Sequence, residues 1–370
     1  MAKKGPVGGN LFDNLISNTT SRYVNPILKS KMLQPQEFCP TDVPLFNLAL
    51  SGKLDGGVSS NGGLTVIAGP SKHFKTLYAF KMMEAFSKKH KDGVMLFYDS
   101  EFGSTKEYLS SFDIDLERVI HIPVTTIEQL RHETAKQLKF LEDEAQKGAL
   151  KQKVFVMIDS LGNLASEKET TDAESGKDKA DMTRAKAAKS FYRIVTPKLN
   201  LLGIPAVVIA HTYKSQDFIP RDIVAGGEGS MFSSNSVFVI GKKQDKSSSG
   251  DLNGWQFIIK IEKSRFIKEK SKLPITVHYG KGILPYSGLA ELATQLKIIK
   301  PCRINRTTGY EYKDDENEIQ IPASEIDRSA NFWDIIFTNT DFKQRVEDYY
   351  SLEVKAQDIS DFIEIEEDAS

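Results

Sequence analysis

The chain has 370 residues, 40% of them hydrophobic and 27% charged, with a formal net charge of −1, which is typical of a soluble protein with a substantial core. No apolar run approaches the ~20 residues that a membrane-spanning helix needs, and the first residues lead into no signal-like segment, so we expect a cytoplasmic protein without a membrane partner. Two cysteines and six histidines without metal-ligand spacing exclude a disulfide framework and give no pattern for a structural zinc site.

Residues 1–38 are predicted to form a separate N-terminal arm, with a Gly-rich start and a short helix at 11–16. After it, apolar runs rich in β-branched residues alternate with helical or polar stretches, which predicts an α/β fold around a largely parallel sheet. The first four runs are almost continuously apolar, as in strands covered on both faces, whereas the last two alternate and predict an antiparallel extension at one edge. The expected strands are 64–69, 94–100, 154–160, 205–211, 236–242 and 255–263, with a helix at 126–148.

The segment after the first strand has the pattern of a phosphate-binding loop, G-x-x-x-x-G-K-[ST], with phenylalanine in place of the second glycine. It lies between a strand and a helical run, where backbone amides and the helix dipole converge on an anion. In such a loop the lysine contacts the terminal phosphates and the hydroxyl joins the shell of Mg²⁺. A side chain at the second glycine position restricts the positive φ angles that glycine adopts cheaply. The loop residues are Gly69, Pro70, Ser71, Lys72, His73, Phe74, Lys75 and Thr76.

Polar side chains follow three of the later strands, at the edge of the sheet where ligands of open α/β folds bind. Asp159 ends an apolar strand and can hold Mg²⁺ or its waters opposite the phosphate loop. Glu101 follows another strand and can orient and deprotonate an attacking water, although a solvated acid at a strand end would look the same. His211 ends a third strand and could bond a γ-phosphate, although a lone histidine is more often structural.

Two polar stretches, 166–182 and 212–229, interrupt the pattern after presumed central strands and should emerge at the same edge. A helix that begins after the first stretch would carry four bases on its near side, a footprint for the phosphates of a nucleic acid. The second stretch supplies aromatic residues for base stacking, further bases and a glycine-rich end. The candidate nucleic-acid contacts are Arg184, Lys186, Lys189, Arg193, Tyr213, Lys214, Arg221, Gly226 and Gly227.

The basic run 260–272 contains six bases and two acids, which suits a solvated face, a ridge for phosphates or a source of charge for a neighbouring subunit's nucleotide. Beyond it, a helix at 289–299 is predicted to open a small α-rich region. The last 20 residues carry seven acids and one base, which gives them a net charge of −6 and leaves a net charge of +5 on the other 350 residues. This tail either competes for a polyanion-binding surface or serves solubility.

Taken in this order, the motifs resemble the RecA family of recombinases over residues 40–290, and within it the UvsX-type recombinases of T-even-like bacteriophages. The phage branch also has phenylalanine in the phosphate loop. The resemblance implies a RecA-type P-loop ATPase core (39–288), an N-terminal polymerisation arm (1–38), a small C-terminal α-rich domain (289–352) and an acidic tail (353–370). The resembling stretches are 45–52, 69–76, 96–103, 158–165, 181–186, 193–197, 211–213 and 262–265.

The resemblance implies roles for the residues at the catalytic positions of the family. Lys75 and Thr76 would bind phosphate and Mg²⁺, and Asp159 would be the acid of the Walker B strand. Glu101 would be the catalytic carboxylate. His211 stands where the family usually has a glutamine that senses the γ-phosphate, so the role carries over with a different chemistry.

Further implied roles concern the base and the subunit interface. Tyr108 stands where the family stacks a tyrosine on adenine. Lys263 and Arg265 stand where RecA has two lysines that reach ATP across the subunit interface, and Phe232 stands where a phenylalanine enters the neighbouring subunit. The two polar stretches match the DNA-binding loops of the family, and the N-terminal arm would pack on the adjacent protomer.

The expected function is an ATP-dependent recombination protein that polymerises on single-stranded DNA as a helical filament and exchanges strands with homologous duplex DNA, in repair and recombination-dependent replication. It would use ATP and Mg²⁺ and act with a single-strand-binding protein and a recombination mediator in the host-cell cytoplasm. Two alternatives stay open. One is a RecA-fold hexameric helicase, against which the short arm argues. The other is a weakly hydrolysing, nucleotide-gated DNA-binding protein, which Phe74 and His211 would suit.

Overall fold

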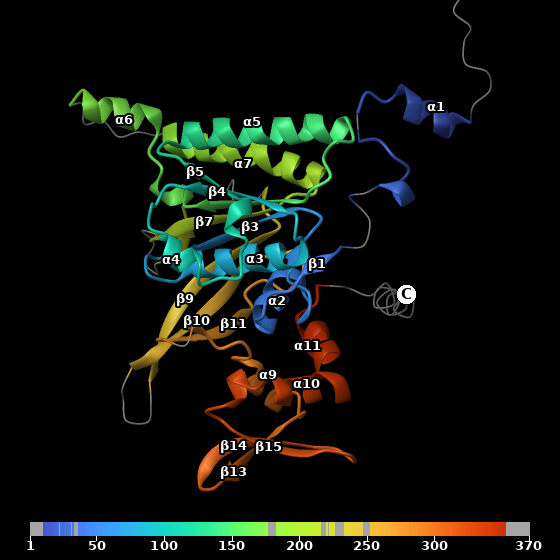
Figure 1. The fold of residues 1–370 in the computed structure, drawn as a ribbon, viewed down its shortest axis with the longest axis vertical. Helices are drawn as coiled ribbons and strands as arrows, with labels where there is room; N and C mark the ends of the chain where they lie inside the picture. Colours follow the sequence, from blue (N-terminus) through green and yellow to red (C-terminus); the bar gives the residue numbers. More distant parts are fainter. Residues whose placement is uncertain are drawn as a thin grey trace, which may run out of the picture.

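The computed structural model describes residues 10–21, 23–30, 32, 36–176, 183–215, 220, 222–225, 233–246, 252–280 and 282–352. A large sheet crosses the middle of the molecule (Figure 1). Its parallel part has the strand order β9-β3-β7-β6-β4-β5. These strands are β3 (Gly63–Gly69), β4 (Val94–Asp99), β5 (Val119–Pro123), β6 (Val154–Asp159), β7 (Pro205–Lys214) and β9 (Ser236–Lys246).

An antiparallel extension continues the sheet beyond β9, as the alternating runs predicted. It consists of β10 (Leu252–Lys263), β11 (Lys272–His278) and β12 (Gly282–Ile283). All six predicted strands are therefore confirmed, and β5 is an additional strand at the opposite edge. The predicted fold class, an α/β fold with a largely parallel central sheet, is confirmed.

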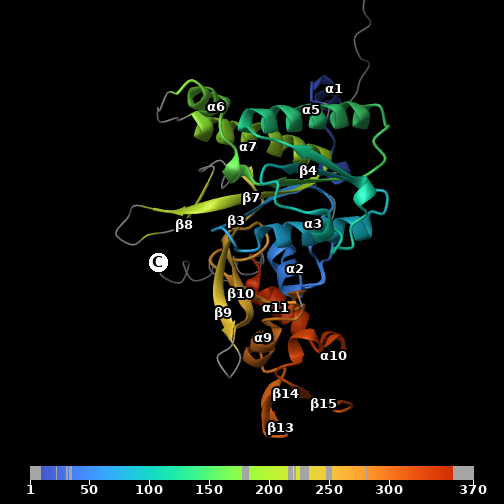
Figure 2. The ribbon, with the colours of Figure 1, turned by 60° about the vertical axis from the view of Figure 1, so that its left-hand side comes forward.

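Helices cover both faces of the parallel strands (Figures 1 and 2). On one face α5 (Ile127–Gln146) packs beside α7 (Thr183–Leu202), and on the other lie α3 (Lys75–Lys89) and α2 (Pro44–Ser51). Alternate side chains of the fully buried strand β6 pack on the two faces of the sheet. Phe155 and Met157 join the core cluster that contains α3, and Val156 and Ile158 join the cluster of α5 and α7. This double burial explains the continuous apolar runs.

The N-terminal arm contributes one helix with little cover from the rest of the chain. In α1 (Leu11–Asn18), Asn10 caps the first turn and no residue is buried. Leu11, Phe12 and Leu15 are large apolar side chains that are mostly exposed. Further along the arm, the Tyr23 hydroxyl bonds the Glu142 carboxylate of α5 at 3.2 Å. Exposed apolar side chains on one helix are typical of an interaction surface. The arm also contains η1 (Ile27–Lys29), and β1 (Phe38–Cys39) pairs β2 (Val58–Ser59).

The C-terminal region contains more strand than predicted (Figure 1). The helix expected at 289–299 is α9 (Leu289–Gln295), and a three-stranded antiparallel sheet follows it. The prediction of an α-rich region is therefore incomplete. Buried Trp333 anchors the helices, and its indole N–H donates to the Ile326 carbonyl at 2.9 Å. The remaining elements are β13 (Lys300–Ile304), β14 (Thr307–Lys313), β15 (Glu318–Pro322), η5 (Ile326–Arg328), α10 (Ala330–Asn339) and α11 (Phe342–Tyr350).

The two polar stretches are more regular than their composition suggested. The first begins with α6 (Glu167–Glu174), whose N-terminus is a capping box in which the side chains of Ser166 and Glu169 bond each other's backbone N–H. In the second, β7 continues to Lys214 and pairs with β8 (Asp222–Val224). Short elements elsewhere are α4 (Lys106–Leu109), η3 (Leu116–Arg118) and η4 (Leu161–Asn163).

Candidate active site

The predicted phosphate loop connects β3 to the first turn of α3, so its backbone N–H groups lie at a helix N-terminus. Gly69 must be small, because a Cβ atom there would lie 3.0 Å from the Ile240 carbonyl oxygen. Lys72 adopts the left-handed conformation with φ of 60°. Its carbonyl accepts a hydrogen bond from Lys242 Nζ at 3.5 Å, and His73 Nδ1 lies 2.9 Å from the Ser71 carbonyl.

Phe74 occupies the position of the missing glycine with φ of 54°, as the N-cap of α3. The left-handed conformation that the pattern requires is thus present without glycine, at a cost of about 1–2 kcal/mol for a residue with a Cβ. The ring packs against the buried ring of Phe257 on β10, with 5.1 Å between centroids. Such a contact is worth about 0.5–1.5 kcal/mol, so it offsets much of the backbone cost.

Lys75, Thr76 and Asp159 meet at the carboxyl edge of the sheet. The Thr76 hydroxyl donates to Asp159 Oδ2 at 2.8 Å, and Lys75 Nζ donates to the Pro70 carbonyl at 2.9 Å. Burial lowers the pKa of Lys75, while the carboxylates of Glu101 and Asp159 act in the opposite direction. Burial, with the negative charge of nearby carboxylates, raises the pKa of Asp159 to about 7.

The surroundings of Asp159 suit a bound cation. Asp159 Oδ1 is buried and has no hydrogen-bond partner among the described residues, and the Thr76 hydroxyl lies beside the other oxygen. Carboxylate and hydroxyl oxygens are ligands that Mg²⁺ prefers, and a positive ion there would favour the ionised carboxylate. In the described part of the chain, no group of three His, Cys, Asp or Glu side chains could hold a metal by itself. The residues therefore fit an ion that also binds phosphate oxygens.

Glu101 and His211 lie together beside Thr76 and Asp159. Glu101 Oε1 accepts a hydrogen bond from the Ser160 hydroxyl at 2.8 Å and lies 3.1 Å from His211 Nε2. The bond to His211 lowers the pKa of Glu101, and the bond to Ser160 acts in the same direction. His211 approaches the backbone after β6 so closely that a Cβ on Gly162 would lie 2.4 Å from the imidazole. An ionised carboxylate held by two side chains is suited to orient a water and accept its proton.

Asp99 holds the segment that carries Glu101, and sequence reasoning missed this function. Its buried carboxylate accepts the backbone N–H of Glu101 at 3.0 Å and of Phe102 at 2.9 Å, and its other oxygen lies 3.2 Å from His121 Nε2. Phe102 is left-handed, with φ of 53°. The signal in the sequence was a second acid at the same strand end, just before Glu101.

Tyr108 lies on α4, near the start of α3. Its ring packs edge-on against Phe112 with centroids 5.3 Å apart and against Phe80 at 5.9 Å. Burial raises the pKa of the Tyr108 hydroxyl to about 12, so it stays protonated. Together with Phe74, Tyr108 lines a pocket of about 520 Å³ between α3, α4 and the sheet extension. The pocket is large enough for a nucleoside and adjoins the phosphate loop.

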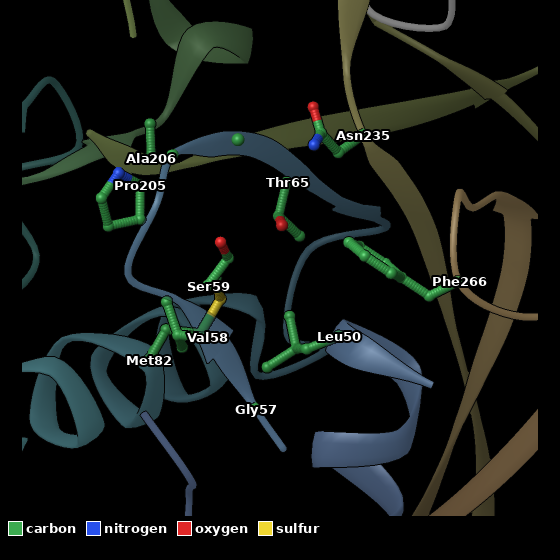
Figure 3. A pocket seen from close by; sticks show the side chains of 12 residues that line it. Leu50, Gly57, Val58, Ser59, Thr65, Met82, Pro205, Ala206, Asn235 and Phe266 are labelled. Carbon is green, nitrogen blue, oxygen red and sulfur yellow. The ribbon is translucent and has the colours of Figure 1, made fainter. Parts of the chain in front are cut away.

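Lys263 and Arg265 lie elsewhere. Lys263 of β10 pairs with Val237 of β9, which in turn pairs with Val66 of β3. From there the chain runs toward the amino ends of the parallel strands. The residue after Arg265, Phe266, lines a small pocket of about 20 Å³ at those amino ends, and Pro205 lines the same pocket from its other side (Figure 3). This pocket holds little more than one water molecule. The structure thus does not bring the two bases to the phosphate loop of their own chain.

The candidate nucleic-acid residues fall into two groups. Lys186, Lys189 and Arg193 are exposed and share one side of α7, because residues three and seven apart on a helix lie within one face. Arg184 lies on the opposite side and donates through Nη2 to the Gly162 carbonyl near the candidate active site. The expectation that all four bases share one face is therefore wrong for Arg184.

The second polar stretch is described in part. Tyr213 is exposed at the end of β7, and Lys214 Nζ bonds Asp222 Oδ1 of β8 at 2.7 Å. The other predicted residues of this stretch, Arg221, Gly226 and Gly227, lie outside the described residues, as do Phe232 after it and the acidic tail, 353–370.

No family model matches the chain, but several characterised proteins do. The recombination and repair protein of Enterobacteria phage T4 is 42% identical over 364 residues, which are 97% of this chain and 90% of the relative. Protein RecA of Mesomycoplasma hyopneumoniae is 22% identical over 279 residues, 74% of this chain and 77% of the relative. Protein RecA of Aquifex aeolicus is 23% identical over 261 residues. Among the described residues, no helix is long and apolar enough to span a bilayer.

The similarity to the phage protein extends over nearly the whole chain, and both similarities agree with the resemblance noted in the sequence. They support a role in recombination and repair. The chain belongs to the RecA family of recombinases, among its phage recombination and repair proteins.

Proposed function

We propose that the protein is a single-stranded-DNA-dependent ATPase that polymerises on DNA as a helical filament and catalyses homologous pairing and strand exchange. The observation that carries this proposal is the meeting of two pairs, Thr76 with Asp159 and Glu101 with His211, at the carboxyl edge of the sheet. Together with the phosphate loop they supply the parts that phosphoryl transfer to water requires.

In the proposed reaction, Lys75 and the loop amides bind the β- and γ-phosphates of ATP, and Thr76 and Asp159 would hold Mg²⁺. When bound, the ion neutralises charge that develops on the phosphate oxygens. Glu101 accepts the proton of the water that attacks the γ-phosphorus, and ADP and phosphate are released. His211 bonds Glu101, so it can connect the presence of the γ-phosphate with the position of β7 and the loop that follows.

Lys263 and Arg265 would act on the ATP of a neighbouring subunit. Their distance from the phosphate loop of their own chain supports this arrangement. ATP would then join two subunits and favour an extended filament, and its hydrolysis would release that contact. Phe232 would enter the same neighbour.

The exposed apolar side chains of α1 support polymerisation through the N-terminal arm. Ile120 of the edge strand β5 and Phe140 of α5 are exposed and line a groove of about 310 Å³, which supports an acceptor for the arm of another subunit. We propose that the arm (1–38) of one subunit docks there. The core (39–288) would bind ATP and DNA, and the region 289–352 and the tail 353–370 would complete the subunit.

DNA would contact the exposed bases of α7 and the loop after β7, where Tyr213 can stack on a base and Lys214, Arg221, Gly226 and Gly227 can contact the backbone. Arg184 would contact DNA from the side of α7 that faces the candidate active site. Because base pairing supplies recognition of homology, we expect strong salt dependence with little sequence preference. A single-strand-binding protein and a recombination mediator would be its partners in the host-cell cytoplasm.

Glu101→Gln tests the proposal. The substitution keeps a hydrogen-bond acceptor but removes the base, so we expect ATP hydrolysis on single-stranded DNA to fall at least about 100-fold while nucleotide binding persists. Glu117→Gln, an exposed acid on η3, is the matched control and should hydrolyse ATP normally. Electron microscopy with a non-hydrolysable ATP analogue should show DNA-dependent filaments. Unchanged hydrolysis in Glu101→Gln would refute the catalytic assignment, and closed rings would favour a helicase.

A further inference from the structure

The outer edge of the sheet is connected to the proposed catalytic carboxylate, Glu101, through two side chains. β5 is the last strand of the large sheet and pairs with β4, so that His121 lies opposite Phe97 (Figure 1). The imidazole packs on the Phe97 ring with 5.5 Å between centroids, and its Nε2 lies 3.2 Å from Asp99 Oδ2 at the end of β4. The His121 side chain is 52% exposed and that of Asp99 is 5% exposed, so the connection runs from the surface into the site.

The two oxygens of Asp99 have different partners. Oδ1 accepts the backbone N–H groups of Glu101 and Phe102, and Oδ2 is the oxygen beside His121. An ionised carboxylate only accepts hydrogen bonds, so the imidazole donates to it through Nε2. A carboxylate held at Oδ2 cannot turn about its Cβ–Cγ bond without losing that hydrogen bond. His121 therefore fixes the position of the oxygen that holds the Glu101 backbone.

The backbone that carries Glu101 leaves the sheet at Ser100. The Ser100 hydroxyl exchanges two hydrogen bonds with the Ser160 backbone, which holds the last residue before the turn. The next two N–H groups both donate to Asp99, and Phe102 is left-handed and exposed. A residue with a Cβ adopts this conformation at an energetic cost, which a hydrogen bond to a buried carboxylate offsets. The direction in which the Glu101 side chain leaves the backbone thus depends on Asp99.

The carboxylate of Glu101 is held separately from its backbone. Ser160 and His211 bind its Oε1 at 2.8 Å and 3.1 Å. A general base must lie within hydrogen-bond reach of the water whose proton it accepts, and a displacement of about 1 Å costs about 100-fold in rate. Glu101 is therefore fixed at both of its ends, and the contacts that fix its backbone end continue to His121.

We propose that His121 is a positioning residue for ATP hydrolysis, which fixes Glu101 through Asp99 without contact with the nucleotide. The inference rests on the proposed ATPase function and adds to it a residue on the edge strand. Three strands, β7, β6 and β4, separate β5 from β3, the strand that leads into the phosphate loop. Loss of the imidazole should therefore slow the chemical step and leave the binding of ATP unchanged.

Steady-state hydrolysis of ATP on single-stranded DNA tests the proposal. His121→Phe keeps a ring on Phe97 and removes the donor to Asp99, whereas His121→Ala removes both. Each should lower kcat about 10-fold, less than removal of the base itself, with KM for ATP within about 2-fold of wild type. His121→Gln carries an amide N–H that can take the place of Nε2–H and should retain most of the activity. His132→Ala, which removes an exposed histidine of α5, is the matched control and should leave kcat unchanged.

A double variant tests whether His121 acts through Glu101. The base is absent in Glu101→Gln, so the addition of His121→Phe should lower the residual rate by less than about 2-fold, whereas independent effects would multiply. Radiolabelled ATP makes this residual rate measurable. A further 10-fold loss in the double variant would overturn the proposal, because His121 would then affect hydrolysis without Glu101.

The outcomes distinguish this inference from the function on which it rests. If Glu101→Gln loses hydrolysis while His121→Phe and His121→Ala hydrolyse ATP like wild type, the inference is wrong and the ATPase proposal stands. A raised KM at unchanged kcat would also overturn the inference, since it would place His121 in nucleotide binding. If the wild type hydrolyses no ATP on single-stranded DNA, the proposed function fails as well. A lower kcat at unchanged KM, with activity retained in His121→Gln, supports both.

Discussion

At the scale of single residues, Phe74 combines backbone strain with a stabilising ring contact. Phe74→Gly relieves about 1–2 kcal/mol of left-handed strain and loses about 0.5–1.5 kcal/mol of contact with Phe257, so its free energy of unfolding should stay within about 1.5 kcal/mol of wild type. Phe74→Ala keeps the strain and loses the contact, so it should be the least stable of the three. Urea unfolding of the variants measures this order. A Phe74→Ala protein as stable as wild type would show that the ring contact contributes nothing.

The residues of the candidate site differ in how far the sequence could place them. One rule predicts that four of them lie together, because the carboxyl ends of parallel strands meet at one edge of the sheet. These residues are Thr76, Asp159, Glu101 and His211. Asp99 could not be assigned in this way. Its partners are backbone N–H groups and a histidine from the edge strand β5, which the apolar pattern did not reveal.

At the scale of elements, α7 presents different bases on its two sides. Replacement of Lys186, Lys189 and Arg193 by alanine should weaken single-stranded DNA binding and make the slope of log K against log[salt] shallower by about 2, since each contact with a single strand contributes about 0.7. Fluorescence anisotropy over a range of salt concentrations measures both quantities. The control removes two lysines of α5, Lys136 and Lys139, and the lysine that follows the helix, Lys147. An equal effect in the control would mean that net charge, rather than this face, attracts DNA.

The sequence predicted long buried elements better than short or mixed ones. All six expected strands were correct. Burial on both faces gives the first four a continuous apolar run, and the last two show the alternation of strands with one covered face. The helix α6 was missed because it has almost no apolar residues and depends on its capping box. The sheet β13–β15 was missed because its strands are half exposed and carry many charges. Arg184 lies about 200° around the helix from Lys186, so the spacing itself placed it on the opposite side of α7 and the expectation of a shared face overlooked this.

The junction between the sheet extension and η5 provides a test of pH dependence. Burial, with the negative charge of Glu291 and Asp245, raises the pKa of Asp327 from 3.8 to about 6. Between about pH 4 and 6 the folded state holds a proton that the unfolded chain releases, so this group's contribution to stability falls as pH rises through that window. Asp327→Asn cannot ionise and should be more stable than wild type by about 1–3 kcal/mol at pH 7.5, with a gain that shrinks toward pH 4.

Urea unfolding at several pH values measures this gain. Asp315→Asn, in an exposed turn between β14 and β15, is the control and should change stability little at any pH. A gain for Asp327→Asn that is the same at pH 7.5 and pH 4.5 would contradict the assignment, since it would not arise from ionisation.

At the scale of the whole molecule, the proposed site is divided between two subunits, and mixing experiments can test the division. Glu101→Gln lacks the base but keeps Lys263 and Arg265, whereas the double variant Lys263→Ala/Arg265→Ala lacks the cations but keeps the base. Each should be inactive alone. Mixed filaments should regain hydrolysis, because about one interface in four combines two intact halves when head-to-tail subunits assemble at random. Mixtures as inactive as their components would place all catalytic groups within one chain.

The strand β10 has a consequence for how such filaments behave. It carries Trp255 beside the nucleotide pocket of its own subunit and, about 27 Å further along, Lys263, which would contact the next subunit's nucleotide. Each β10 would then connect the nucleotide of its own subunit with that of the next subunit, so strands and nucleotides would alternate along the filament. Because every β10 has the same orientation along the filament, loss of one γ-phosphate would change the contact with one neighbouring subunit before the contact with the other. Hydrolysis should therefore proceed from subunit to subunit in one direction.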